Sequence, residues 1–141
     1  MSAPSTPPGY HSITPYLLVG DVDGSIAFVR AAFEAEVTER LTDDAGQARH
    51  AEVRIGDSKL MLGNGPAGSA VLYHYVADVD AVFARAVEAG GTVFQEPRDE
   101  FYGDRVAAVN DPFGVQWWIA TRKETLTSEQ MQARMGEARP D

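Results

Sequence analysis

The distribution of apolar and polar positions along the chain predicts one series of elements twice: a strand, a helix and three further strands. In the first half, alternating or continuous apolar runs predict strands over 12–19, 36–41, 49–55 and 59–62. Between the first two strands, an apolar stripe at helical spacing predicts a helix; the stripe consists of Val22, Ile26, Val29 and Phe33. Pro15 lies inside the first predicted strand and donates no backbone hydrogen bond, so it restricts that strand to an edge, or itself to a position that faces away from the hydrogen-bonded ladder.

The second half repeats this order and closes on a tight turn. Its predicted strands cover 71–76, 92–95, 105–110 and 115–120, with a loop over 97–104, and its predicted helix covers 78–89. The turn has a physical cause, since Pro112 fixes one backbone angle and Gly114 tolerates a positive one. The apolar run after this turn is too continuous for a surface strand, so we expect it to be covered on both faces.

A repeated pentapeptide marks both helix starts. VGDVD at 19–23 opens the first helix, where Asp21 or Asp23 can cap it, and VADVD at 76–80 opens the second. Units repeated at this length usually bury their apolar faces against each other. We therefore predict an α+β fold of two βαβββ repeats and a short C-terminal helix. The predicted divisions are a flexible N-terminal tail (1–11), a first unit (12–64), a linker (65–70), a second unit (71–122) and a C-terminal helix and tail (123–141).

Composition and charge narrow the class of protein. The 141 residues are 44% hydrophobic, enough for a real core, and include no cysteine, so we expect neither disulfides nor thiolate metal ligands. The net charge of −9 argues against nucleic acid as a partner, because phosphates need a basic surface. No apolar run is long enough for a membrane span and the N-terminus lacks an apolar signal core. We expect a cytoplasmic protein without membrane contact.

Several stretches, in this order, resemble the vicinal oxygen chelate superfamily, which includes glyoxalase I, extradiol dioxygenases, fosfomycin-resistance enzymes and bleomycin-binding proteins. The stretches are RHAEVRIGDSKLML (49–62), FYGDR (101–105), DPFGVQWWIAT (111–121) and KETLTSEQM (123–131), and they look most like the PhnB-like branch. The resemblance spans roughly 12–121. It implies a cupped, mixed or antiparallel sheet around a cleft, in a protein that is commonly a homodimer.

The resemblance also indicates where metal-using members of the superfamily carry their ligands. Those places fall here on Thr14, Met61, Val71 and Trp118. A hydroxyl, a thioether, an alkyl group and an indole do not form a credible ligand set for a divalent cation. We therefore predict neither a metal nor another cofactor in this cleft.

The same placement of strands assigns side chains to the cleft. The predicted ligand-binding residues are Thr14, Tyr16, His50, Met61, Val71, Tyr73, Tyr75, Tyr102, Arg105, Gln116 and Trp118. Tyr102, Asp104 and Arg105 belong to a polar loop at 99–105 that either gates or hydrogen-bonds a ligand or is only a turn fixed by an Asp–Arg pair. A mainly aromatic and apolar surface of this kind suits a flat or amphipathic organic molecule, unless the same side chains fill a closed core. His74 comes three positions after Val71, so we expect it to point away from the cleft.

Two classes of function follow from these features. The first, which we favour, is a metal-free binding protein of the bleomycin-resistance type that sequesters a hydrophobic or cationic small molecule, such as an antibiotic, in a dimer cleft. The second is an enzyme of the same superfamily, a metal-dependent lyase, isomerase or dioxygenase whose relocated site uses His50, Glu52 or His74. A metal-free enzyme that uses Tyr102 or Arg105 as an acid or electrostatic stabiliser is a further alternative.

Overall fold

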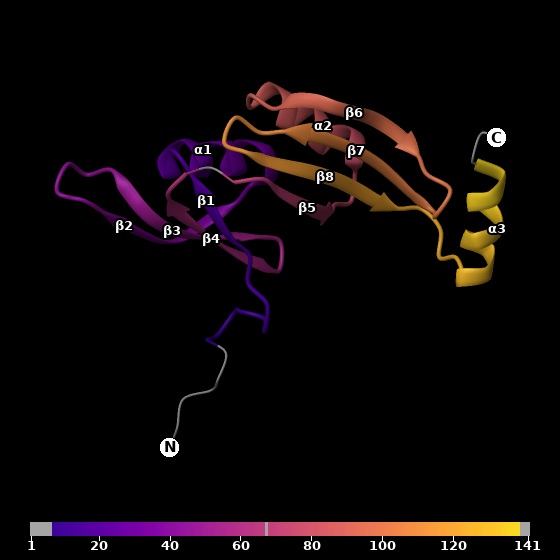
Figure 1. The fold of residues 1–141 in the computed structure, drawn as a ribbon, viewed down its shortest axis with the longest axis horizontal. Coiled ribbons are helices and arrows are strands. Elements are labelled where there is room, and N and C mark those ends of the chain that lie inside the picture. The colour runs from indigo at the N-terminus through magenta and orange to yellow at the C-terminus, as the bar shows by residue number, and fades with distance from the viewer. Residues whose placement is uncertain (1–6, 67, 139–141) are drawn as a thin grey trace, which may run out of the picture.

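Two four-stranded mixed sheets, one from each half of the chain, form the framework of the protein (Figure 1). The computed structural model describes residues 7–66 and 68–138. The first sheet has the strand order β1 (Tyr16–Val19), β4 (Ser58–Asn64), β3 (Ala48–Ile55) and β2 (Glu36–Thr42). The second sheet has the order β5 (Ala70–Tyr75), β8 (Val115–Arg122), β7 (Asp104–Asn110) and β6 (Thr92–Asp99). In each sheet the first strand runs parallel to its neighbour and the other pairs are antiparallel. The predicted α+β fold of two βαβββ repeats is therefore confirmed.

One helix covers each sheet, and both helices begin in the same way. Asp21 caps α1 (Val22–Phe33) and Asp78 caps α2 (Val79–Glu88), each by accepting a backbone N–H of the first turn, at 2.9 Å and 3.2 Å respectively. α1 packs against β3 and β4, α2 packs against β6, β7 and β8, and the two helices contact each other. Each sheet thus has an inner face covered by its helix and an outer face on the opposite side.

Asp23, the other candidate cap of α1, serves a different purpose. Its carboxylate accepts from Arg40 Nε at 2.8 Å and from the Ala48 N–H at 2.9 Å. The bond from Arg40 is the main cause that lowers the pKa of Asp23. Asp23 therefore ties the start of α1 to the hairpin formed by β2 and β3.

The apolar inner faces form one core that both halves share. Side chains from both sheets and both helices are fully buried in it, including Val19, Val53, Leu62, Val79, Val109 and Ile119. At the junction of the halves, Phe33 from α1 packs against Trp117 from β8, with ring centroids 4.7 Å apart. A strand of the second half therefore contacts the helix of the first half directly.

β1 is shorter than the predicted strand over 12–19. It begins at Tyr16, directly after Pro15. Proline has no N–H to donate, so regular pairing stops there, although the Pro15 carbonyl still accepts the Met61 N–H at 2.9 Å. The proline that the sequence predicts to be an edge feature is thus also the boundary of the strand.

β6 is longer than the predicted strand over 92–95. It continues to Asp99 and includes Pro97, where we expected a loop. Proline is tolerated at this position because β6 is an edge strand and its pairing with β7 is irregular between Gln95 and Arg98. The connection from β6 to β7 is therefore shorter than the predicted loop over 97–104.

β8, predicted to be covered on both faces, is covered mainly on one. Val115, Trp117 and Ile119 are buried on the inner face, whereas Gln116 and Trp118 are only half-buried on the outer face. The apolar run after the turn therefore has an uncovered side within a single chain.

A C-terminal helix, α3 (Ser128–Ala138), follows β8 and lies beyond the end of the second sheet (Figure 1). It begins with the expected capping box: Gln130 N–H donates to Thr127 Oγ1 at 3.1 Å, and Thr127 N–H donates to Gln130 Oε1 at 2.9 Å. Of the two predicted tails, residues 1–6 and 139–141 lie outside the described residues. None of the described helices is long and apolar enough to cross a membrane.

Candidate functional site

The outer faces of the two sheets carry most of the large apolar side chains that the described chain leaves exposed. Seven of the ten lie there, namely Tyr16, Leu18, Leu41, Val71, Tyr73, Tyr75 and Phe94. The strand registers explain this grouping, since residues two apart on a strand face the same side as the residues opposite them. Because soluble monomers rarely expose extended apolar surfaces, both outer faces are candidate binding surfaces.

Aromatic rings cover the outer face of the second sheet. Tyr73 on β5 lies opposite Trp118 on β8, and the Tyr75 ring is 5.1 Å from that of Tyr73. Phe94 from β6 extends the surface, with its ring 5.8 Å from that of Trp118. Ala108, which lies opposite Trp118 on β7, is fully buried. The arrangement suits the binding of a flat aromatic group.

A chain of hydrogen bonds holds the indole of Trp118 in place. Its Nε1 donates to Gln116 Oε1 at 2.8 Å, and Gln116 Nε2 donates to Asn110 Oδ1 at 2.9 Å. Val71 on β5 lies opposite Gln116 and is 64% exposed. The indole N–H is the only polar group of Trp118, and it already has a hydrogen-bond acceptor. A ligand can therefore stack on the ring without leaving that N–H unsatisfied.

The end of the aromatic surface near Tyr73, away from Gln116, is also polar. The Tyr73 hydroxyl donates to Asp104 Oδ2 at 2.7 Å, and Asp104 is buried. Burial, followed by the contacts with Tyr102 and Asp104, raises the pKa of Tyr73, and burial is also the main cause that raises the pKa of Tyr102. Both phenols are therefore protonated at neutral pH and can donate and accept hydrogen bonds. Six predicted residues thus gather around one face: Val71, Tyr73, Tyr75, Tyr102, Gln116 and Trp118.

The outer face of the first sheet is more polar. It carries Tyr16 on β1, His50 on β3 and Met61 on β4, with Tyr16 Oη 3.5 Å from His50 Nδ1. Tyr10 lies beside Glu52 of the same face; burial and this carboxylate raise the pKa of Tyr10 to about 12. Three of the predicted residues therefore lie together on this face, and they are separated from the six on the second sheet.

Two predicted residues lie elsewhere. Thr14 precedes β1, and its hydroxyl donates to the His11 carbonyl at 3.4 Å. Arg105 turns to the inner side of β7, where its Nε lies 2.9 Å from Asp80 and its Nη1 lies 3.4 Å from Asp99. The bond to Asp80 is the main cause that raises the pKa of Arg105. Because side chains alternate along a strand, Arg105 lies on the side of β7 away from the aromatic surface. There its two ion pairs link α2 to β6.

The side chains do not fit the divalent metal that some members of the resembled superfamily use. The positions concerned hold Thr14, Met61, Val71 and Trp118, none of which offers an imidazole or carboxylate. In the described part of the chain, no three His, Cys, Asp or Glu side chains are grouped to hold a metal ion. The residues of the alternative relocated site are also divided, with His50 and Glu52 on the outer face of the first sheet and His74 on the inner side of β5.

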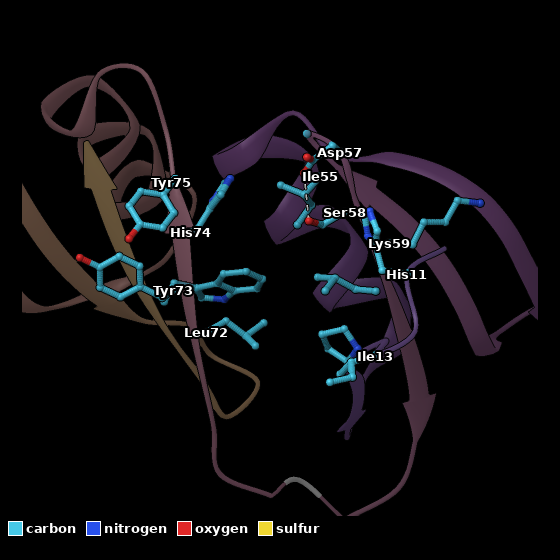
Figure 2. A pocket seen from close by; sticks show the side chains of 14 residues that line it. His11, Ile13, Ile55, Asp57, Ser58, Lys59, Leu72, Tyr73, His74 and Tyr75 are labelled. Atoms are coloured by element: carbon cyan, nitrogen blue, oxygen red, sulfur yellow. Dashed lines mark hydrogen bonds between the residues drawn. The ribbon is translucent and has the colours of Figure 1, made fainter. Parts of the chain in front are cut away.

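Sequence reasoning missed a groove of about 400 Å³ that lies between the two halves. Figure 2 shows Leu72 and His74 of β5 on one wall, and Ile13 with the turn between β3 and β4 on the other. Tyr73 and Tyr75 point to the opposite side of β5. The alternation within β5 predicts which side chains share a side, but no local pattern predicts that the segment before β1 faces them.

His74 is held in this groove by aromatic neighbours. Its ring lies edge-on to Phe33, with centroids 4.9 Å apart, and 6.5 Å from Trp117. Its buried Nδ1 has no hydrogen-bond partner among the described residues. Burial lowers the pKa of His74 below its ordinary value. The folded protein therefore favours the neutral imidazole.

The free energy of unfolding is expected to fall as the pH decreases below about 6.5, the ordinary pKa of histidine. In that window the unfolded chain takes up a proton at His74 that the folded chain resists, so stability rises with pH. The loss stays below the ~1.4 kcal/mol per pH unit that one proton can contribute. Urea unfolding at about pH 7.5 and about pH 5.5 measures it. The wild type should lose more stability than His74→Phe, and equal losses would assign the effect to other groups.

Comparison with known proteins identifies the family of this fold. The family model of the Glyoxalase/Bleomycin resistance protein/Dioxygenase superfamily matches residues 9–119. The chain belongs to this superfamily. The uncharacterized Mycobacterium bovis protein Mb0911c is 32% identical over 139 residues, which cover 88% of this chain and 91% of that protein. The Mycobacterium tuberculosis protein Rv0887c is also 32% identical, over 88% of this chain and 82% of its own.

Several solved structures share the fold. TioX from Micromonospora sp. ML1 superposes with a TM-score of 0.70 at 23% identity, covering 79% of this chain and 98% of TioX. A glyoxalase-related enzyme from Fulvimarina pelagi gives 0.65 at 23% identity, covering 79% and 87%. A PhnB protein from Bacillus cereus gives 0.66 at 17% identity, covering 79% and 99%. At these identities the superpositions bear on the fold alone.

Proposed function

We propose that the protein is a metal-free small-molecule binding protein that sequesters a hydrophobic or cationic compound, such as an antibiotic, on the outer face of the second sheet. The observation that carries the proposal is the aromatic surface of Tyr73, Tyr75, Phe94 and Trp118, with polar groups at both of its ends. Aromatic rings with a few convergent polar groups are typical of sites for organic ligands. Superfamily membership supports a small molecule as the partner.

We propose further that the protein acts as a homodimer in the cytoplasm. Both outer faces look away from the helices and expose large apolar side chains within one chain. A twofold dimer that sets the first sheet of one copy on the second sheet of the other would cover both faces and create two equal clefts. Tyr16, His50 and Met61 would then form the wall opposite the aromatic surface. The absence of cysteine is in keeping with a reducing compartment.

We place the chain in the PhnB-like branch of the superfamily. The support comes from the order of the stretches at 49–62, 101–105, 111–121 and 123–131. The likeness to the Bacillus cereus PhnB protein, which extends over 79% of this chain, is in keeping with this placement.

Calorimetric titration with naphthylethanol, a neutral aromatic probe, tests the binding function. Wild-type protein is expected to bind the probe, and Trp118→Ala is expected to weaken the affinity by about tenfold or more because it removes the central stacking surface. Val87→Ala is the control, since Val87 is an exposed apolar side chain on α2, outside the proposed cleft. Light scattering should give twice the chain mass of 15.3 kDa.

Other outcomes would contradict separate parts of the proposal. A folded wild type that does not bind the probe, or that binds it as Trp118→Ala does, would overturn the binding surface. A monomeric protein would overturn the cleft between two copies. Elemental analysis after dialysis against Zn, Ni, Mn and Fe is expected to find no stoichiometric metal. One tightly held metal per chain would overturn the metal-free assignment and favour the enzyme alternative.

A further inference from the structure

Asp104, at the start of β7, is a buried carboxylate at the polar end of the aromatic surface. It is 6% exposed, and the Tyr73 hydroxyl donates to its Oδ2 at 2.7 Å. Among the described residues, no basic side chain forms an ion pair with it. Burying a carboxylate without a compensating charge costs stability.

The acids around Asp104 differ from it, because each of them has an arginine partner. The ion pairs join Asp80 and Asp99 to Arg105, Glu100 to Arg98, and Glu124 to Arg134. Lys123 borders a hollow that Asp104 also lines, but it forms no ion pair with Asp104. Within this group of described carboxylates, Asp104 alone forms no ion pair, although Arg122 lies opposite it on β8.

Tyr73, whose hydroxyl contacts this carboxylate, has a second tyrosine ring beside it on the side of the proposed cleft. The rings of Tyr73 and Tyr75 are 5.1 Å apart and lie together on the side of β5 away from the groove (Figure 2). Tyr102 lies close enough to Tyr73 to contribute to the raised pKa of the Tyr73 hydroxyl. Aromatic faces attract cations through their negative quadrupole, and the attraction grows when the cation is removed from water. Tyrosines around a carboxylate thus favour an organic cation.

We propose that Asp104, Tyr73, Tyr75 and Tyr102 form a binding site for a protonated amine group of the ligand. The inference rests on the proposed function, because the aromatic part of the same ligand would lie on Trp118. An ammonium group could donate to the Asp104 carboxylate and to a tyrosine hydroxyl oxygen while the rings cover its remaining surface. A ligand with an aromatic part and a primary amine matches both ends of the surface.

The chemistry of the site fits an amine better than a divalent metal ion. Calcium takes six to eight oxygen ligands and zinc takes about four strong donors. The site offers one carboxylate and neutral phenols, and no larger group of acids is placed for a metal in the described chain. A single positive charge with several N–H donors matches one carboxylate without leaving an excess of charge.

The experiment compares naphthylethylamine with naphthylethanol, two probes that share the aromatic part and differ in the charged group. Wild-type protein is expected to bind the amine about tenfold more tightly than the alcohol at neutral pH. Asp104→Asn retains an oxygen that can accept from Tyr73 but removes the charge, so the ratio should fall close to one. The matched control is Asp44→Asn, at an exposed turn, which should keep the wild-type ratio.

A second variant covers the case in which Asp104→Asn does not fold. Tyr75 is 60% exposed, so Tyr75→Leu removes one ring with little effect on the core, and it should lower the ratio severalfold. Tighter binding of the amine that survives both changes would overturn the ammonium site, as would equal affinities for both probes in the wild type. In those cases the binding of naphthylethanol still supports the proposed function. If a folded wild type binds neither probe, both proposals fail.

Discussion

Trp117→Ala is expected to lower the free energy of unfolding by about 3–5 kcal/mol, the usual cost of deleting a large buried aromatic side chain. Trp117 is 3% exposed, packs against Phe33 and donates its indole N–H to Asp111 at 2.9 Å. Trp118→Ala is expected to cost far less in the isolated chain, because Trp118 is half-buried on the outer face. Urea unfolding of the two variants at low protein concentration gives the comparison.

A further variant separates the two roles of Trp117. Trp117→Phe keeps most of the ring volume but loses the N–H, so it should cost about 1–3 kcal/mol through the unpaired Asp111 oxygen. Similar losses for Trp117→Ala and Trp118→Ala would mean that both faces of β8 are equally important to the folded chain. That result would contradict the assignment of an inner and an outer face.

Asp111→Ala is expected to destabilise the protein by about 3 kcal/mol, because a single carboxylate satisfies three donors. Its Oδ1 accepts the N–H groups of Phe113 at 2.8 Å and Val115 at 3.0 Å, and its Oδ2 accepts the Trp117 indole. Asp111 is buried, so the donors left behind are poorly placed to bind water instead. Thermal and urea unfolding both measure the effect.

Asp43→Ala is the matched control for this prediction. Asp43 also accepts two backbone N–H groups of its turn, from Ala45 at 2.9 Å and Gln47 at 3.0 Å. This hairpin is exposed and Asp43 has no indole partner, so its replacement should cost less than about 1 kcal/mol. A loss at Asp111 no larger than the loss at Asp43 would show that the turn, and not the buried link to Trp117, determines the cost.

The two sides of β8 have different roles. The inner side of β8 holds the core together through Trp117 and Ile119, and its outer side carries Trp118 and Gln116 of the proposed binding surface. Substitutions on the outer side can therefore change the ligand without unfolding the protein. Stability and specificity then depend on alternate residues of the same strand.

Much of the fold could be predicted from the sequence, because its signals are local. The repeated Val-x-Asp-Val-Asp pattern located both helix starts, and Asp21 and Asp78 cap them as one motif used twice. The capping box of Thr127 and Gln130 also formed as predicted. Such features depend on a few neighbouring residues and on a backbone conformation that those residues favour by themselves. The errors in strand bounds occurred at Pro15 and Pro97, where an edge position decides whether a proline ends a strand, and the expected cover on both faces of β8 was also wrong.

The candidate site could be predicted only in part. Strand alternation correctly grouped Tyr73 with Tyr75, and the ladder between β5 and β8 placed them beside Trp118. The prediction placed Asp104 and Arg105 together in one polar loop beside the cleft, whereas the two side chains point to opposite sides of β7 and only Asp104 faces the tyrosines. The alternation of β7 could have corrected this, had the boundary of that strand been placed one residue earlier.

The sequence by itself determined which residues form strands and helices, which of them share a face, and which superfamily the chain belongs to. Only the tertiary structure decided that both outer faces stay open within one chain, that a groove separates the halves beside His74, and that Asp104 is buried without a basic partner among the described residues. The physical reason is distance along the chain. Local patterns reflect backbone preference and periodicity, whereas burial and charge compensation depend on segments that meet only after the sheets have packed.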